Sequence, residues 1–544
     1  MENNQNITFT VYHRNAVPEE YPGGLAYSVH LAYSLDGLKY QSLNKNYGIL
    51  FEQGDVRGDN TIFPKGVRDP KLFRMDEGMY GICGYRTRED GSLDDSSQGK
   101  LLLWLTKDFI EFERVGLVEP VFLSQWMLSD FIQVEKEVAL KAIEHWTPVE
   151  NTALEVSEFI VVQTEEELNE IEGTAVYSDG SVAVKKLHWN TATIDFTKPG
   201  IYEASATVGS APLKFPLAKG YGDPVLLKWD GKWYFIATND NLDDIGIYAR
   251  EADTVEGLFS EGIEEYLILP FDEVRGFEQT FWAPEFHLIG GELYILFAVS
   301  GHEWGPQCHI MRLKKGMSII KEESWENPIP VVRADGNPLA PGAISLDMTY
   351  IPAKSGSYMV WSYRKHIGTP KDTGSMLYIA TVDEREPWRL TSDPVLLTRP
   401  LYGWENVDGT INNEGPYCFI RDGKVYLTYS GGSANRYTYA LGLLTADVTD
   451  DLTDIFSWKK SVTPVLTYYS VEGEYGPGHN SFFVNDDGEL MIAYHGETDI
   501  KETLRCDGIR RVHFRRDGRP DFELSALQDL REEFRVIQRK IVVK

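Results

Sequence analysis

The chain has 544 residues, of which 42% are hydrophobic and 12% aromatic, and it carries a formal net charge of -30 at pH 7. This length allows several domains, and the composition is sufficient for large hydrophobic cores. The charge argues against nucleic acid and anionic membrane surfaces as partners, because both would repel an acidic protein, whereas neutral sugars meet no such objection.

Residues 1–128 carry alternating apolar and polar patterns, such as LAYSLDGLKY and GMYGICGYRT, which predict a β-rich N-terminal region. Its first residues, MENNQNITFTVYHRN, contain neither an apolar stretch nor a cleavage-type pattern of small residues. No apolar run in the sequence reaches transmembrane length. These features lead us to expect a cytoplasmic protein.

Residues 129–212 begin with a helical pattern, VEKEVALKAIEHW, followed by short alternating strands between SDG and KPG turns. This order predicts a small β-sandwich. The stretch resembles bacterial Ig-like domains, and Trp189 and Tyr202 stand where the resemblance places an aromatic pair. We expect the module to be a spacer or brace, with direct sugar binding as the alternative.

Residues 213–544 contain five polar-Gly turns spaced 60 to 67 residues apart, each between a short apolar strand and an alternating strand. Such hairpins in series predict a five-bladed β-propeller, so the fold class is all-β. We expect the terminal strand RVIQRKIVVK to pair with an early strand and close the ring, because closure protects exposed strand edges. The turn glycines are Gly231, Gly291, Gly356, Gly423 and Gly488.

One position recurs eight or nine residues before each turn glycine, at the start of the first hairpin strand. Innermost propeller strands line the central channel, so we expect the residues at this position to converge there. Acidic residues before a strand are also ordinary turn formers, but three acids in register make that explanation weaker. The ring consists of Asp223, Trp282, Asp347, Glu414 and His479.

Asp69 is a further candidate for this ring, because it lies nine residues before Gly78 in the N-terminal region. If residues 129–212 are an insertion, a sixth related unit becomes possible. The five later units already supply a complete ring, so we place Asp69 outside the site.

From residue 218 onward the chain resembles glycoside hydrolase family 43, in particular its five-bladed arabinofuranosidase and xylosidase members. The ordered motifs that carry the resemblance are GDP, FWAPEFH, SLDMT, NEGP, GLLTAD and YGPGHNSF. This family hydrolyses glycosidic bonds with inversion. The resemblance implies that Asp223 is the general base, that Glu414 is the general acid, and that Asp347 orients the acid and tunes its pKa.

The chemistry agrees with these roles. Inversion needs one carboxylic acid to protonate the leaving oxygen and one carboxylate to activate water on the opposite face of the sugar. Asp223 and Glu414 come from non-adjacent units, which leaves room for a sugar ring and a water molecule. Asp347 lies on the unit next to Glu414, and its negative charge would keep Glu414 protonated.

Three other residues are candidates for substrate or metal binding. His479 could be a structural or electrostatic support, a catalytic base, or a neighbour of a central Ca²⁺ held partly through water, as the resemblance implies. Trp282 could be a platform for a sugar ring or simple channel packing. Arg510, in GIRRVHF, is our choice for the arginine that meets the sugar. No organic cofactor is expected.

We therefore predict an inverting exo-glycosidase that removes terminal α-L-arabinofuranosyl residues from short plant-cell-wall oligosaccharides. A β-xylosidase of the same fold is the nearest alternative. A catalytically silent carbohydrate-binding propeller is a second alternative, and the complete set of three acids argues against it. The expected cytoplasmic location disfavours an endo-acting arabinanase.

Overall fold

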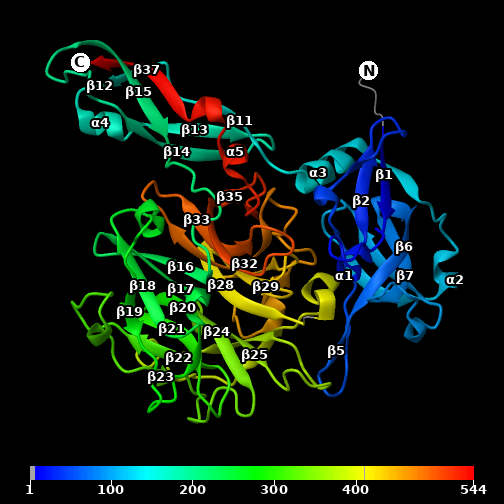
Figure 1. Cartoon of the computed structure of the whole chain (residues 1–544). Helices are drawn as coiled ribbons and strands as arrows, with labels where there is room; N and C mark the ends of the chain where they lie inside the picture. The colour runs from blue at the N-terminus through cyan, green and yellow to red at the C-terminus, as the bar shows by residue number, and fades with distance from the viewer. Residues whose placement is uncertain (1–5, 410) are drawn as a thin grey trace. The chain divides into compact units, whose positions relative to one another are not determined.

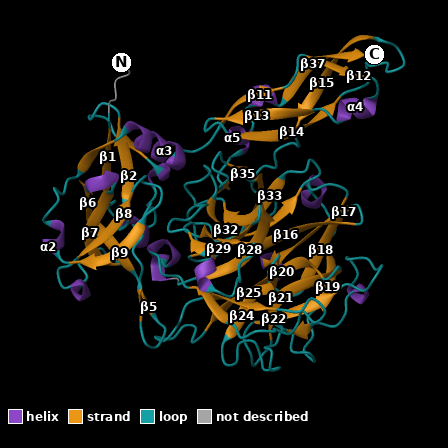
Figure 2. Cartoon of the chain, turned by 180° about the vertical axis from the view of Figure 1, so that it is seen from behind, coloured by secondary structure: helices purple, strands orange, loops and turns teal. Residues whose placement is uncertain are grey.

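The computed structural model describes residues 6–409 and 411–544 and is built mainly of strands joined by turns and a few short helices, which confirms the all-β class (Figures 1 and 2). The chain divides into two compact units. The first contains residues 1–147, 216–482 and 493–507, and the second contains residues 148–215, 483–492 and 508–544. No helix in the described part of the chain is both long enough and apolar enough to cross a membrane.

Five antiparallel sheets follow one another along the chain from Tyr221, each with its strands in sequence order (Figure 1). The first four sheets have four strands, β16–β19, β20–β23, β24–β27 and β28–β31, and the fifth has three, β32–β34. The first strands of the first four sheets contact one another in succession, and Ser481 of the fifth sheet's first strand bonds to Pro224 of the first sheet's first strand, so these strands are innermost. They are β16 (Tyr221–Trp229), β20 (Gln279–Ile289), β24 (Ile344–Ala353), β28 (Asn413–Arg421) and β32 (Tyr475–Val484).

The remaining strands extend each blade outward from its innermost strand. The second strands are β17 (Lys232–Asn239), β21 (Glu292–Ser300), β25 (Gly356–Arg364), β29 (Lys424–Gly431) and β33 (Leu490–Glu497). The third strands are β18 (Ile247–Ala252), β22 (Gln307–Arg312), β26 (Met376–Thr381), β30 (Ala440–Asp447) and β34 (Cys506–Arg511). The outer strands are β19 (Tyr266–Leu269), β23 (Ile329–Pro330), β27 (Val395–Thr398) and β31 (Lys459–Lys460).

The ring closes between the fifth blade and the first. The hydroxyl of Ser481 on β32 donates to the carbonyl of Pro224 on β16 over 2.7 Å. The backbone of Leu217, just before β16, donates to the carbonyl of Asp507 over 2.9 Å. These contacts join strands far apart in the sequence, and they confirm the expected five-bladed ring.

The N-terminal region folds into two four-stranded sheets in the same compact unit as the propeller. Helix α3 (Lys136–Trp146) buries Ala139, Ala142 and Trp146 in the hydrophobic core of these sheets. The helical pattern expected at the start of the Ig-like module therefore belongs to the N-terminal region instead. In sheet order, the strands of the first sheet are β10 (Phe131–Val134), β1 (Ile7–Tyr12), β2 (His30–Ser34) and β3 (Gln41–Ser42). Those of the second sheet are β6 (Lys65–Arg74), β7 (Tyr80–Arg88), β8 (Leu101–Thr106) and β9 (Glu113–Val118).

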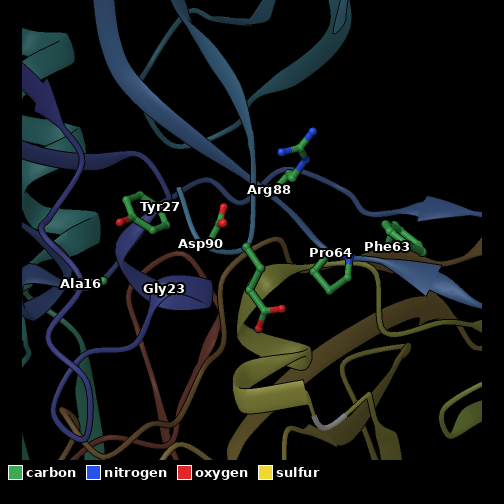
Figure 3. Close-up of a pocket in the computed structure, with 8 residues that line it drawn as sticks. Ala16, Gly23, Tyr27, Phe63, Pro64, Arg88 and Asp90 are labelled. Atoms are coloured by element: carbon green, nitrogen blue, oxygen red, sulfur yellow. The ribbon is translucent and has the colours of Figure 1, made fainter. Parts of the chain in front are cut away.

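A surface pocket of about 480 Å³ opens in this region beside the short helix α1 (Gly23–Ala26) (Figure 3). Its wall combines the Tyr27 and Phe63 rings with charged side chains from the end of β7 and the loop after it. The lining residues are Ala16, Gly23, Tyr27, Phe63, Pro64, Arg88, Glu89 and Asp90.

The second unit is a six-stranded sheet that includes the last strand of the chain, β37 (Val536–Val543). β37 runs antiparallel to β15 (Gly200–Val208) and parallel to β12 (Phe159–Val162). The other members, in sheet order, are β11 (Asn151–Glu155), β13 (Glu172–Tyr177) and β14 (Val182–Trp189).

The partner of β37 corrects the expectation that the terminal strand closes the propeller. Its residues Ile541 and Val543 are buried in one hydrophobic cluster with Ile160, Leu168 and Ala204 of the Ig-like module. A strand with an apolar face pairs where that face can be buried, and here the module supplies the core. Consequently residues 508–544 belong to the second unit, and the predicted boundary of 213–544 for the propeller is too long.

Candidate active site

Each innermost propeller strand contains a residue with positive φ that, in at least four of the five strands, lies next to an irregularity in the pairing. Such bulges turn side chains out of the regular alternation and are common beside active sites. The residues are Asp223 (φ 59°), Ala283 (45°), Asp347 (52°), Gly415 (56°) and His479 (40°). The recurring position is thus occupied by Ala283 and Gly415 in blades two and four, and Trp282 and Glu414 each precede it by one residue. β20 and β32 each contain a second residue with positive φ, Thr280 and Gly476, nearer the start of the strand.

Asp223 is the most strongly stabilised carboxylate of the site. It is buried, and it accepts hydrogen bonds from Oγ1 of Thr238 at 2.6 Å and from Nη1 of Arg505 at 3.1 and 3.2 Å. Nδ1 of His479 lies 3.0 Å from its Oδ1. Burial would raise the pKa of Asp223, but the charges of His479 and Arg505 outweigh burial and hold it well below the usual value. Asp223 is therefore ionised at neutral pH.

Glu414, in contrast to Asp223, favours the protonated form. Tyr439 donates to its Oε1 over 3.0 Å, and the side chain is partly exposed. Burial by the surrounding protein raises the pKa of Glu414, and the charge of Asp347 raises it further, to about 7. The raised pKa favours the protonated form of Glu414 that a general acid requires.

Asp347 is fixed to the strand that carries Glu414. Its Oδ2 accepts from the N–H of Gly415 at 3.1 Å and from Oγ of Ser362 at 2.9 Å. Burial raises the pKa of Asp347 as well, against the opposing charge of His479. The structure thus brings all three predicted acids to one channel, linked through His479 and Gly415.

His479 connects Asp223 to the two other acids. Burial would lower its pKa, but the charge of Asp223, and then those of Asp347 and Glu414, raise the pKa to about 9. A protonated imidazole donates to Asp223 and cannot act as a base, so the geometry favours electrostatic support among the possibilities considered for His479. Its ring also lies against Gly415, where any Cβ would come within 2.8 Å of the imidazole, which explains the glycine of NEGP.

Few side chains near His479 could bind the expected Ca²⁺ ion directly. Among residues 6–409 and 411–544 no group of three or more His, Cys, Asp or Glu side chains is arranged to hold a metal ion. Nε2 of His479 is buried and has no hydrogen-bond partner within this part of the chain. A hard cation beside this nitrogen would take most of its ligands from water. A water-held Ca²⁺ therefore stays a prediction.

Trp282 is partly exposed, and its indole N–H donates to Oδ2 of Asp244 over 2.8 Å. This bond fixes the ring while leaving an apolar surface free, which suits a sugar platform.

The arginine that contacts Asp223 is Arg505, which precedes β34 and also binds Asp240 through Nε at 3.0 Å. Arg510 lies within β34 and belongs to the second unit, so a role in sugar binding stays a prediction for it. Sequence reasoning did not identify Arg505.

The sequence analysis also did not identify the other residues that contact the three acids. His495 accepts from the N–H of Asp223 at 3.1 Å. Thr238 and Ser362 on second strands, and Tyr439 just before β30, are hydrogen-bond donors. Glu285 and His287 form a buried pair, with Oε2 and Nε2 2.6 Å apart. Only this pair carried a visible signal, because it belongs to the FWAPEFH motif.

Asp69 occupies a similar backbone geometry in the N-terminal region. Its φ is 50°, it lies at a pairing irregularity in β6, and its N–H donates to Nδ1 of His13 over 3.3 Å, as that of Asp223 donates to His495. Its carboxylate, however, is 47% exposed and approaches only His13 and Arg68 among the ion pairs of the described residues. This arrangement lacks the buried charges that characterise Asp223.

Comparison with known proteins agrees with this geometry. The model for glycosyl hydrolases family 43 matches residues 269–520, and the model for bacterial Ig-like domain (group 4) matches residues 171–210. An extracellular exo-alpha-(1->5)-L-arabinofuranosidase of Streptomyces chartreusis is 33% identical over 307 residues, which cover 56% of this chain and 88% of that protein. The chain belongs to glycosyl hydrolases family 43.

Two further proteins are similar to this chain. An extracellular exo-alpha-(1->5)-L-arabinofuranosidase of Streptomyces avermitilis is 31% identical over 333 residues, and the match spans 59% of this chain and 65% of that protein. The crystal structure of an alpha-L-arabinofuranosidase from Lactobacillus brevis is 30% identical with a TM-score of 0.50, covering 58% of this chain and 98% of that one.

These comparisons correct the expected cytoplasmic location of this family 43 protein. Both Streptomyces relatives are named extracellular. The expectation rested on the absence of an apolar leader from the first residues, and such an absence is weaker support than the named location of relatives. The argument from location against an endo-acting arabinanase therefore falls with it.

Proposed function

We propose that this protein is an exo-acting α-L-arabinofuranosidase that inverts the anomeric centre and removes terminal arabinofuranosyl residues from plant-cell-wall oligosaccharides. The observation that carries the proposal is the different surroundings of two carboxyl groups in the propeller. Asp223 lies beside the cationic side chains of Arg505 and His479, whereas Glu414 accepts from Tyr439 and is followed by Gly415, whose N–H binds Asp347. Asp223 is held ionised by His479 and Arg505, whereas burial and Asp347 keep Glu414 partly protonated at neutral pH. The names of both Streptomyces relatives support the sugar and the exo mode.

In the proposed reaction Glu414 gives its proton to the glycosidic oxygen as the bond to the anomeric carbon breaks. Asp223 takes a proton from a water molecule, and the oxygen of that water attacks the anomeric carbon from the opposite face. Inversion of configuration follows from this geometry. The next turnover requires Glu414 to regain a proton and Asp223 to lose one, and exchange with solvent supplies both.

A simple test compares purified protein on aryl α-L-arabinofuranoside and on aryl β-D-xyloside. We expect the protein to release phenol from the arabinofuranoside. We also expect NMR to show that the first sugar product has the inverted anomeric configuration. Faster turnover of the xyloside would instead indicate a β-xylosidase. Binding of either sugar without turnover would indicate a silent carbohydrate-binding propeller.

The mode of cleavage needs a separate measurement, because the argument from location against an endo-acting arabinanase no longer holds. We propose that arabino-oligosaccharides are shortened one terminal unit at a time. Monosaccharide should therefore be the first product from both a labelled oligosaccharide and polymeric arabinan. Internal cleavage, seen as an early mixture of longer products, would contradict the exo mode.

A further inference from the structure

The loop between β27 and β28 carries a buried carboxylate that the reaction itself does not use. Glu405 ends the short helix η7 (Gly403–Glu405) and has 0% of its surface exposed. It accepts from the N–H of Tyr402 at 2.8 Å and from the hydroxyl of Tyr429 at 2.9 Å, and Nζ of Lys460 lies 2.6 Å away. A buried charge with this many partners is costly to disturb, so residues 402–405 have one strongly favoured arrangement.

This network reaches the residue next to the general acid. Nδ2 of Asn413 donates to Oε1 of Glu405 over 2.9 Å, and Oδ1 of Asn413 accepts from Lys460 at 3.3 Å. Asn413 is itself fully buried. On the other side of Glu414, the N–H of Gly415 is bound to Asp347. Glu414 therefore extends from a backbone that is held at both neighbouring residues.

The N-terminal region packs on the same loop. The N–H of Gly54 donates to the carbonyl of Leu401 over 2.7 Å. Gly24 of α1, next to the pocket residue Gly23 in Figure 3, approaches Gly403 so closely that a Cβ on Gly24 would lie 2.6 Å from the carbonyl oxygen of Gly403. One hydrophobic cluster joins both sides of this contact and contains Tyr21, Leu25, Ala26 and Phe51 with Tyr402, Trp404, Val407 and Tyr429.

We propose that the N-terminal region positions the general acid, acting through the packing of Gly24 on Gly403 and the hydrogen bonds of Glu405 to Asn413. Glu405 is a positioning residue, because it acts on Glu414 only through its neighbour. The inference rests on the proposed function. It gives the N-terminal region a part in proton donation, which depends on placing the acid within hydrogen-bond reach of the leaving oxygen.

Two variants disturb this connection at different points. Glu405→Gln keeps the size of the side chain and removes the charge that Lys460 and Asn413 contact. Gly24→Ala adds a single methyl group against Gly403, within the N-terminal region. Gly58→Ala is the matched control, because the same methyl group at Gly58 meets no atom within 4 Å.

The measured quantity is the ratio of kcat on an aryl α-L-arabinofuranoside with a poor leaving group to kcat on one with a good leaving group. This ratio is independent of the fraction of folded protein, so partial unfolding cannot imitate the effect. Both Glu405→Gln and Gly24→Ala should lower the ratio about 10-fold, because a misplaced acid harms only substrates that need protonation. Gly58→Ala should keep the wild-type ratio.

Wild-type ratios in both Glu405→Gln and Gly24→Ala would overturn the inference, whatever their thermal stability. A ratio in Gly58→Ala that falls as far as that in Gly24→Ala would also overturn it, since the effect would then not depend on the contact with Gly403. Absence of turnover by the wild-type protein on every aryl glycoside would refute the proposed function instead, so the two failures are distinguishable.

Discussion

The N–H of Gly415 donates to Oδ2 of Asp347 over 3.1 Å, which joins the carboxylate of blade three to the residue that follows Glu414 on blade four. The same contact holds a negative charge near the carboxyl group of Glu414. After burial, this charge is the largest cause of the raised pKa of Glu414. One carboxylate thus contributes both to the position of the acid and to its protonation.

Replacing Asp347 with Asn should lower the basic limb of the pH profile of kcat/KM. Glu414 must be protonated to act, and its raised pKa of about 7 means that activity is present below this pH and is lost as pH rises through it. With one fewer negative charge nearby, Glu414 loses its proton at lower pH. Initial rates across pH provide the measurement, and an unmoved basic limb would show that Asp347 orients the acid without tuning its pKa.

Glu414→Gln should reduce turnover according to the leaving group. A poor leaving group needs the proton, so its kcat should fall by about 10²- to 10⁴-fold, while a good leaving group should lose much less. A series of aryl α-L-arabinofuranosides with different phenol pKa values measures this dependence. Equal losses across the series would contradict the role of Glu414 as general acid.

Asp223→Asn should lose activity on every substrate, by about 10²- to 10⁴-fold, because water activation is needed whatever group departs. Asp69→Asn is a matched control, since both aspartates have positive φ and precede a proline. Asn tolerates this backbone conformation, so neither change should strain the backbone. Asp69→Asn should turn over at the wild-type rate. Azide rescue of Asp223→Asn to a product of retained configuration would place inversion in doubt.

A Ca²⁺ held through water near Nε2 of His479 would make the protein sensitive to chelation. Treatment with a chelator should lower the thermal transition, and calcium at about 100 times its Kd should restore about 2.7 kcal/mol of stability. Cation and protonated imidazole repel each other, so bound calcium should also lower the pKa of His479. A transition unaffected by chelator and by calcium would leave His479 as a protonated support for Asp223.

Ile541→Ala should destabilise the second unit and leave the propeller unchanged. Ile541 on β37 is fully buried in the core of the Ig-like module, and such a truncation costs about 2–5 kcal/mol. Val536→Ala on the same strand is the control, because its side chain is 60% exposed. Calorimetry should show one lowered transition with aryl glycoside turnover retained. Loss of turnover with a lowered propeller transition would instead support the original expectation for this strand.

The blades and the acids could be predicted because both depend on local patterns. A hairpin is made by residues close in sequence, so five glycine turns with alternating strands were sufficient to indicate five blades. Asp223, Asp347 and Glu414 each begin an innermost strand, and a ring brings such positions together whatever the details of packing. Asp69 shares the pattern, and the exposed surroundings of its carboxylate became visible only in the fold.

Features that depend on distant partners were not visible in the sequence. The apolar face of β37 would suit either sheet, and only the available core decides which one it joins. The long side chain of Arg505 reaches Asp223 from a loop about 280 residues away in sequence, and no local pattern distinguishes it from Arg510. The sequence by itself determined the repeating strands and the acids they carry. Tertiary structure decided which charges surround each acid, and those charges set which carboxyl group keeps its proton.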